Sequence, residues 1–213
     1  MKNKRILLRV FGIAIFAVFA TSWAAAEGWS YRDRGMLLLD RGEFESAILD
    51  FTVAIRLNPN DSMAFHGRGV AHDLMGAPDL AIADFTHSIR LNPNHAGSFF
   101  NRGGVHFRRW NMDLAIADFT QAIRINPNNA DAFAIRGWAH SNRGDRDLAI
   151  ADFTEAIRIN PNNAGTFASR GHMHLDRGDY SLAVADFEAA LRINPNDSGA
   201  KQSLERARQR MGR

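Results

Sequence analysis

Residues 148–162 read LAIADFTEAIRINPN, and residues 114–128 (LAIADFTQAIRINPN) and 80–94 (LAIADFTHSIRLNPN) repeat this sequence with few changes. The stretches ESAILDFTVAIRLNPN at 45–60 and SLAVADFEAALRINPN at 181–196 extend the series in both directions. The five prolines near their ends lie 34 residues apart. A fixed period of this length indicates stacked supersecondary units. The repeats are therefore framed as 28–61, 62–95, 96–129, 130–163 and 164–197.

Each repeat is expected to hold two antiparallel helices. Asn-Pro-Asn ends the second helix, because the residue before proline avoids the helical region and proline cannot continue the helix. Glycines between the two halves fit left-handed helix caps, except in the third repeat, where Trp110 and Asn111 stand at the turn. In the second helix of the fourth repeat, apolar residues cover most of the surface, which predicts a helix packed on two sides. They are Leu148, Ala149, Ile150, Ala151, Phe153, Ala156 and Ile157.

This pattern resembles the tetratricopeptide repeat family, in which an aromatic, a glycine, a second aromatic, small residues and a proline recur. The matching residues in the fourth repeat are Phe133, Gly137, His140, Ala149, Phe153, Ala156 and Pro161. The resemblance covers residues 28–197. It implies an all-α, right-handed superhelical solenoid of five helix-turn-helix repeats.

Two departures from the family pattern recur with the same period. The first is an arginine before the glycine, at Arg34, Arg68, Arg102, Arg136 and Arg170. These arginines could form a ladder of positive charges that binds anions. An acid also recurs on the second helix, however, at Asp50, Asp84, Asp118, Asp152 and Asp186. We therefore favour one ion pair per repeat, because half-buried pairs of this kind fix register more than they add stability.

The second departure is a histidine where the family usually has tyrosine, at His72, His106, His140 and His174, with Leu38 in the first repeat. These histidines could be a metal site or a pH device. Neighbouring copies would lie about 10 Å apart, too far to share a metal held at about 2 Å. We expect a ring nitrogen of each to hydrogen-bond a neighbouring backbone or side-chain group, and we predict no metal and no cofactor.

Residues 1–26 have a different composition from the repeats. Basic residues at the start precede the apolar run VFGIAIFAVFA (10–20), and Ala24 and Ala26 form a small-residue cleavage pattern. These features predict a secretory signal peptide cleaved after Ala26. The alternative is an uncleaved membrane anchor, because the 17 residues from Val10 to Ala26 are at the lower end of the spanning range.

The charge of the chain comes largely from its two ends. Removing the leader's four basic residues from 26 leaves 22 against 23 acidic residues, a net charge of −1. The basic character of the full chain therefore does not predict nucleic-acid binding.

The chain has no cysteine, which excludes disulfides, thiol chemistry and lipidation at a leader cysteine.

The tail, residues 198–213, has apolar residues at three- and four-residue spacing, Ala200, Leu204, Ala207 and Met211. We interpret 199–211 as an amphipathic helix that caps the last repeat, since an array must cover its last apolar face. The alternative is a basic anchor for anionic lipid or an acidic partner, although the helix has no aromatic residue to insert into a membrane.

Variation between the copies indicates where specificity lies. The second helices barely change, whereas one stripe of the first helices varies. In the family that stripe lines a concave groove that binds peptides. Carried over by position, the groove candidates are Arg32, Met36, His66, Val70, Phe100, Asn101, Phe107, Arg108, Ile135, Trp138, Asn142 and His172, with Gly104, Ser169 and Asp176 beside them. The cluster Phe100–Phe107–Trp138 either anchors a partner or packs between first helices. Trp110 on its turn is a separate candidate.

These observations predict a non-catalytic scaffold that binds a protein or peptide and is exported, to the periplasm if the source is bacterial. The chain has no cysteine nucleophile, no G-x-S-x-G motif and no glycine-rich phosphate loop, so no enzyme activity and no small-molecule substrate are predicted. The alternative is a structural or self-assembling component of an envelope complex, possibly held by an uncleaved anchor. Membrane contact is expected only if residues 1–26 are retained or the tail binds lipid.

Overall fold

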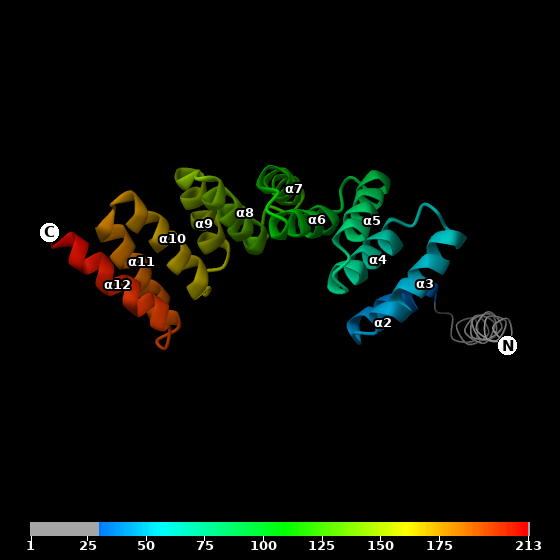
Figure 1. The fold of residues 1–213 in the computed structure, drawn as a ribbon, viewed down its shortest axis with the longest axis horizontal. Helices are drawn as coiled ribbons and strands as arrows, with labels where there is room; N and C mark the ends of the chain where they lie inside the picture. The colour runs from blue at the N-terminus through cyan, green and yellow to red at the C-terminus, as the bar shows by residue number, and fades with distance from the viewer. Residues whose placement is uncertain (1–29, 213) are drawn as a thin grey trace, which may run out of the picture. The chain divides into compact units, whose positions relative to one another are not determined.

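The computed structural model describes residues 30–212, so the predicted leader and its cleavage site lie outside the described residues. The helices in this part of the chain fall into two compact units that divide between Asn92 and Pro93. Figure 1 shows each unit as a succession of paired helices. Within residues 30–212 there is no strand, and the predicted all-α repeat fold is confirmed.

Helix pairs follow the predicted repeats closely. The N-terminal unit contains α2 (Tyr31–Asp40), α3 (Phe44–Leu57), α4 (Ser62–Leu74) and α5 (Pro78–Leu91). The C-terminal unit contains α6 (Ala96–Arg108), α7 (Met112–Ile125), α8 (Ala130–Arg143), α9 (Arg146–Ile159), α10 (Ala164–Arg177), α11 (Tyr180–Ile193) and α12 (Ser198–Met211). None of these helices has the length and apolar character needed to cross a membrane.

The helix ends are set by short sequence signals. Each second helix has as its C-cap the asparagine that precedes the periodic proline, as at Asn160 after α9. The N-cap of the next first helix, Asn163, lies three residues later, and its side chain accepts a hydrogen bond from the Thr166 backbone N–H. A capping side chain of this kind contributes about 1 kcal/mol. The Asn-Pro-Asn segment therefore ends one helix and leads directly into the cap of the next.

The turn inside each repeat has one geometry throughout. Gly42, Gly76, Gly144 and Gly178 have φ between +72° and +92°, and Trp110 has φ +60°. The Gly144 N–H donates to the Ser141 carbonyl at 3.0 Å, and the Trp110 N–H donates to the Phe107 carbonyl at 3.0 Å. The predicted left-handed caps are confirmed, and Trp110 adopts the same backbone as the glycines.

The core repeats one contact in every repeat. The second-helix phenylalanines Phe51, Phe85, Phe119, Phe153 and Phe187 are fully buried. A Cβ atom at Gly137 would lie 2.9 Å from Cε1 of Phe153, closer than side chains approach in folded proteins. Glycine is therefore required after the periodic arginine, because the phenylalanine ring lies against the first-helix backbone.

The second helices are less enclosed than the sequence predicted. Ala149, Asp152, Phe153 and Ala156 are buried on α9, whereas Leu148 is 50% exposed. Ala151 is also exposed. The prediction that this helix is covered on two sides is therefore wrong at Leu148 and Ala151. The equivalent leucines Leu80, Leu114 and Leu182 are similarly exposed.

The last helix packs on the fifth repeat. Leu204 and Ala207 of α12 belong to the same buried cluster as Ala183 and Phe187 of α11. Met211 is 55% exposed, so its predicted place in this apolar stripe is wrong. The stripe is one helical turn shorter than the sequence spacing indicated.

Candidate functional site

Alternate helices contact one another within each unit. In the C-terminal unit α6 contacts α8 and α10 contacts α12, whereas the second helices contact mainly the first helices on either side. In the N-terminal unit α2 contacts α4 in the same way. Neighbouring first helices therefore lie close together, and a side chain on their free face has neighbours from the adjacent repeat.

The aromatic candidates of the C-terminal unit lie on α6 and α8, which touch each other. Phe100 is half-buried, with its ring centroid 5.7 Å from that of Phe119, and Phe107 is also half-buried. Trp138 is 40% exposed, although its ring meets Phe153 edge to face at 5.6 Å. Phe100 and Trp138 thus rest on the core while part of each ring remains accessible.

Further candidates lie on the same two helices and on α10. On α6, Asn101 is half-buried and Arg108 is exposed; on α8, Ile135 is half-buried and Asn142 is exposed. On α10, His172 packs edge-on against Phe187 at 5.0 Å. Burial is the largest cause that lowers the pKa of His172. The C-terminal unit therefore offers an apolar centre with a polar margin.

Ser169 does not belong to this surface. Its side chain is buried, and the Ser169 hydroxyl donates a hydrogen bond to the Gly165 carbonyl at 2.7 Å. The sequence had placed Ser169 on the variable stripe. A serine inside a helix can bond back to the preceding turn, which hides it from a partner.

The N-terminal unit carries four further candidates. Arg32 on α2 lies 3.3 Å from Asp61, in a part-exposed ion pair. Met36 packs against the buried cluster of the first repeat. On α4, Val70 is half-buried and the His66 ring lies 5.7 Å from Phe85. These side chains offer no exposed aromatic comparable to Trp138.

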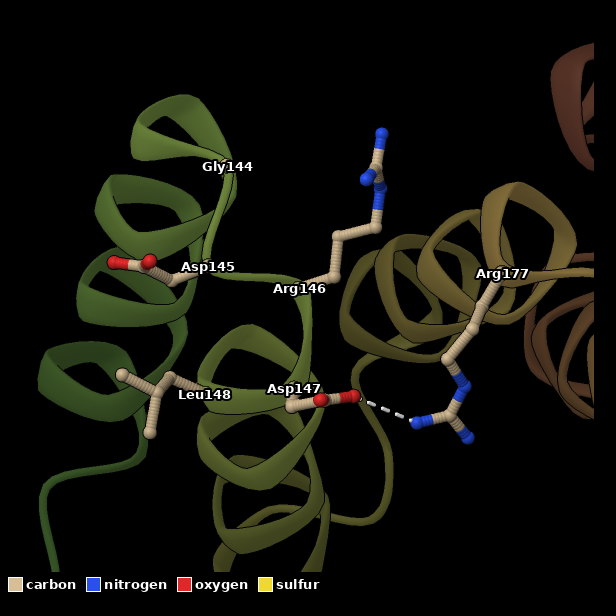
Figure 2. Close-up of a pocket in the computed structure, with 6 residues that line it drawn as sticks. All are labelled: Gly144, Asp145, Arg146, Asp147, Leu148 and Arg177. Atoms are coloured by element: carbon tan, nitrogen blue, oxygen red, sulfur yellow. Dashed lines mark hydrogen bonds and ion pairs between the residues drawn. The ribbon is translucent and has the colours of Figure 1, made fainter.

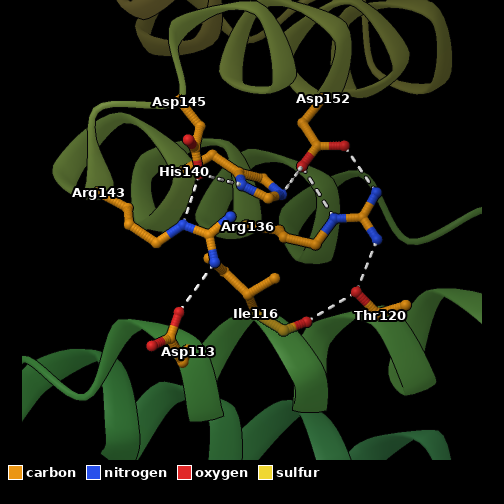
Figure 3. A network of polar contacts seen from close by, with 8 residues as sticks. All are labelled: Asp113, Ile116, Thr120, Arg136, His140, Arg143, Asp145 and Asp152. Atoms are coloured by element: carbon orange, nitrogen blue, oxygen red, sulfur yellow. Dashed lines mark hydrogen bonds and ion pairs between the residues drawn. The ribbon is translucent and has the colours of Figure 1, made fainter.

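The predicted arginine–aspartate pair is confirmed in all five repeats. In the fourth repeat, Arg136 donates to both carboxylate oxygens of Asp152, at 2.7 and 2.8 Å. Arg136 also donates to the hydroxyl of Thr120, on the second helix of the preceding repeat, at 2.9 Å. Figure 3 shows that this guanidinium joins α7, α8 and α9. The arginine therefore fixes register within and between repeats.

The periodic histidines lie beside these pairs. Nε2 of His140 is 3.8 Å from Asp152, and Nδ1 is 3.7 Å from Asp145, both beyond hydrogen-bond distance. Nδ1 of His106, His140 and His174 is buried without a hydrogen-bond partner. The expected hydrogen bond is therefore absent at Nδ1 of these three residues, and at Nε2 it stays a prediction. Burial is the largest cause that lowers the pKa of His140.

The described residues also contain a shallow hollow that the sequence did not predict. It has a volume of about 520 Å³ and is lined by Gly144, Asp145, Arg146, Asp147, Leu148 and Arg177. Figure 2 shows Arg177 reaching Asp147, while Arg146 points away from that pair. The Arg177–Asp147 ion pair measures 2.8 Å. The residues that line this hollow are mostly charged, and none of them is one of the groove candidates. No group of three potential metal ligands occurs within residues 30–212.

The succession of similar helix pairs defines a helical repeat protein. A family model described as tetratricopeptide repeat matches residues 32–95, 75–130 and 136–198. The chain therefore belongs to the tetratricopeptide repeat family. Among curated proteins, no sequence matches this chain significantly.

Several solved structures share the fold. MamA protein is 25% identical, with a TM-score of 0.72 over 79% of this chain and 92% of that chain. YrrB, described as a TPR protein with an unusual peptide-binding site, is 21% identical, with a TM-score of 0.75 over 88% of this chain and 97% of that chain. PilF of Pseudomonas aeruginosa is 17% identical, with a TM-score of 0.74 over 84% and 82%. The likenesses to YrrB and PilF show the fold alone.

Proposed function

We propose that this protein is a non-catalytic scaffold that binds a segment of a partner protein along its first helices, centred on Phe100, Phe107 and Trp138. The observation that carries the proposal is the exposure of Trp138. It remains 40% exposed at a position where the other repeats have Met36, Val70, Gly104 and His172. A position that accepts residues from glycine to tryptophan is not set by packing common to the repeats.

The chemistry of the surface indicates the kind of segment it binds. Two half-buried phenylalanines and an accessible indole offer apolar contact, and Asn101, Arg108 and Asn142 offer polar contact at the margin. Aromatic anchors inside a polar rim are typical of protein interfaces. We extend to this chain the peptide binding that the description of YrrB assigns to that protein. The proposed ligand is a polypeptide segment with large apolar side chains.

The test replaces each anchor by the residue that another repeat uses at the same position. Phe100→Ala follows Ala134, Phe107→Ser follows Ser141, and Trp138→Val follows Val70. We expect the triple variant to keep its helical circular dichroism and to lose most partner binding. A photoreactive residue at position 100 in intact cells identifies the partner, and the same residue at exposed Ala151 is the control. Equal capture from both positions would contradict the proposed surface.

The proposal includes export by the leader. It rests on the basic start, the apolar core and the Ala24–Ala26 pattern. The intact mass of the exported protein tests it, and we expect a chain that begins at Glu27. A mass that retains residues 1–26 would indicate an anchored scaffold instead.

A further inference from the structure

The glycine that follows each periodic arginine is explained by packing. A Cβ atom at this position would lie between 2.8 and 3.1 Å from its nearest neighbour, an atom of the buried phenylalanine or of the aspartate beside it. The five glycines are Gly35, Gly69, Gly103, Gly137 and Gly171. No larger residue fits at these positions unless the core moves.

Gly104 has no such explanation, although it is the next residue of α6 after Gly103. A Cβ atom at Gly104 would have one neighbouring heavy atom within 4 Å, Nη1 of Arg108 at 3.6 Å, which is an ordinary contact distance. No atom of another helix would come within that range. Close packing between helices therefore does not require a glycine at position 104.

A glycine in the middle of a helix lowers the stability of that helix. Glycine loses more backbone freedom on folding than any other residue, so it is less favourable than alanine in a helix interior. At the same position the other repeats have Met36, Val70, Trp138 and His172. An interior glycine usually has a packing or a functional reason. Because packing does not account for Gly104, a functional reason is favoured.

The missing side chain leaves a recess in the proposed binding surface. Phe100 precedes Gly104 by one helical turn and Phe107 follows it by one, so the three positions lie on one face of α6. All three residues are half-buried. Trp138 stands one period after Gly104 on α8, which contacts α6. The recess therefore has the α6 backbone as its floor and aromatic residues beside it.

The chemistry of this recess favours an apolar occupant. In a helix interior the backbone N–H and C=O groups bond to one another, so the floor at Gly104 offers no free donor or acceptor. Arg108 is exposed at the margin, but it already interacts within the chain. A polar side chain in the recess would lose its hydration without gaining a hydrogen bond from the floor. Phe100 and Phe107 instead offer contact to an apolar group.

The shape of the recess favours a single side chain over a broad surface. Gly104, Phe100 and Phe107 are half-buried within the helical unit, so a flat lipid surface does not reach the floor. A side chain that projects from a polypeptide segment is narrow enough to enter. Its apolar surface and that of the recess would both be removed from water, which stabilises the complex.

We propose that Gly104 determines the specificity of the binding surface, because its recess receives one large apolar side chain of the partner segment. This inference rests on the proposed function. The partner's side chain occupies the space that a residue at position 104 would otherwise fill, and it packs against Phe100 and Phe107. The surface therefore selects a segment that has a large apolar residue at this point.

The first experiment tests whether the glycine serves stability. We expect Gly104→Ala to raise the melting temperature by about 2–4 °C, because alanine favours the helix and its Cβ atom has room. Gly103→Ala is the matched change one residue earlier, and it should lower the melting temperature, because its Cβ atom would meet Phe119 and Asp118. A melting temperature that falls in Gly104→Ala would make this glycine a packing residue and overturn the inference.

The second experiment measures binding, and its probe is the purified protein captured at position 100. Gly104→Val installs the residue of the second repeat, and Gly104→Trp installs that of the fourth. We expect Gly104→Val to bind at least about 10-fold more weakly than the wild type, and Gly104→Trp more weakly still. Ala151→Val adds a similar volume at an exposed position of α9 and should bind like the wild type. Wild-type affinity in Gly104→Val would contradict the inference.

A double-mutant cycle identifies the partner's side chain. Mass spectrometry locates the partner fragment that crosslinks to a photoreactive residue at position 107, and each large apolar residue in that fragment is replaced by alanine in turn. For one of these residues, its loss of binding and that of Gly104→Val should not add, because both changes remove the same contact. Losses that add for every residue would place the partner's apolar side chains outside the recess and overturn the inference.

The outcomes separate this inference from the proposed function. If the triple variant Phe100→Ala, Phe107→Ser and Trp138→Val loses the partner while Gly104→Val retains it, the binding surface stands and the inference about Gly104 is wrong. If a photoreactive residue at position 100 captures no protein, or captures lipid in its place, the binding surface and its recess are both overturned.

Discussion

The Phe153 ring contacts two neighbouring residues of α8 that differ in what they tolerate. The ring lies against the backbone at Gly137, where a Cβ atom would come within 2.9 Å, and every repeat has glycine there. The ring also meets Trp138, at a position that varies from glycine to tryptophan between repeats. Two positions that touch the same buried ring are therefore determined by different constraints. Packing determines Gly137, and Trp138 remains available for another role.

Removing the buried ring gives the largest expected effect. Phe153→Ala should destabilise the protein by about 3–5 kcal/mol, because it leaves a cavity in a fully buried layer. Urea unfolding followed by circular dichroism measures the change. A loss below about 1 kcal/mol would show that the layer collapses around the missing ring, and would remove the contrast between Gly137 and Trp138.

The ion pair gives the next largest effect. Asp152→Ala would leave the half-buried Arg136 guanidinium with the Thr120 hydroxyl as its remaining described hydrogen-bond partner. We expect a loss of about 3 kcal/mol, as is usual when one partner of a buried pair is removed.

The double variant Arg136→Met with Asp152→Leu sharpens this result. We expect it to regain most of the lost stability, because an apolar pair of similar size removes both desolvation costs. The free energies of unfolding of the two single variants and the double variant form the test cycle. A double variant as unstable as the sum of the single variants would show that the pair does more than fix register.

Much of the fold follows from the sequence because its signals are local and repeated. The prolines mark helix ends, the glycines mark turns, and recurrence of Arg136 and Asp152 in every copy indicates an ion pair. The exposure of Leu148 was missed, because counting apolar residues around a helix does not show which neighbour covers them. The buried residues of α9 have ordinary helical spacing; they are Ala149, Asp152, Phe153 and Ala156. Because one of them is an acid, a pattern of apolar residues alone does not identify this buried face.

The candidate site was less predictable from the sequence. Comparison of the copies identified Phe100, Phe107 and Trp138 as variable, but exposure depends on the adjacent repeat. Variation between repeats does not by itself indicate exposure, since Ser169 varies and is nevertheless buried. The sequence shows that Trp110 stands where other repeats have glycine. Only the structure shows that its backbone has φ +60°, a conformation that costs a tryptophan conformational free energy.

The periodic histidines give a smaller, pH-dependent effect. Burial lowers the pKa of His140 from its ordinary value of 6.5; the nearby carboxylates of Asp152 and Asp145 oppose the shift, while Arg136 and Arg143 add to it. The unfolded chain therefore takes up protons first as the pH falls. Stability is full above pH 6.5 and declines as the pH drops through 6.5 toward the lowered pKa of the folded protein.

The first repeat supplies the matched variant for this prediction. It has Leu38 where the others have histidine, and Leu38 packs against the buried cluster there. We expect His140→Leu to reduce the loss of melting temperature between pH 7.5 and pH 5.5. His72, His106 and His174 also have lowered pKa values, so part of the loss should remain. An unchanged pH profile would assign the acid sensitivity to other groups.

The smallest expected effect on stability is at the position with the largest proposed effect on binding. Trp138→Val installs the residue of the second repeat and loses one edge-to-face contact with Phe153, worth about 0.5–1.5 kcal/mol. We expect the free energy of unfolding to fall by no more than that, while affinity for the captured partner falls at least 10-fold. Gly137→Val, at the neighbouring contact with the same ring, should reverse the pattern by lowering stability strongly and affecting binding less. If Trp138→Val destabilises the protein as much as Gly137→Val does, both contacts belong to the core and the proposed surface is wrong.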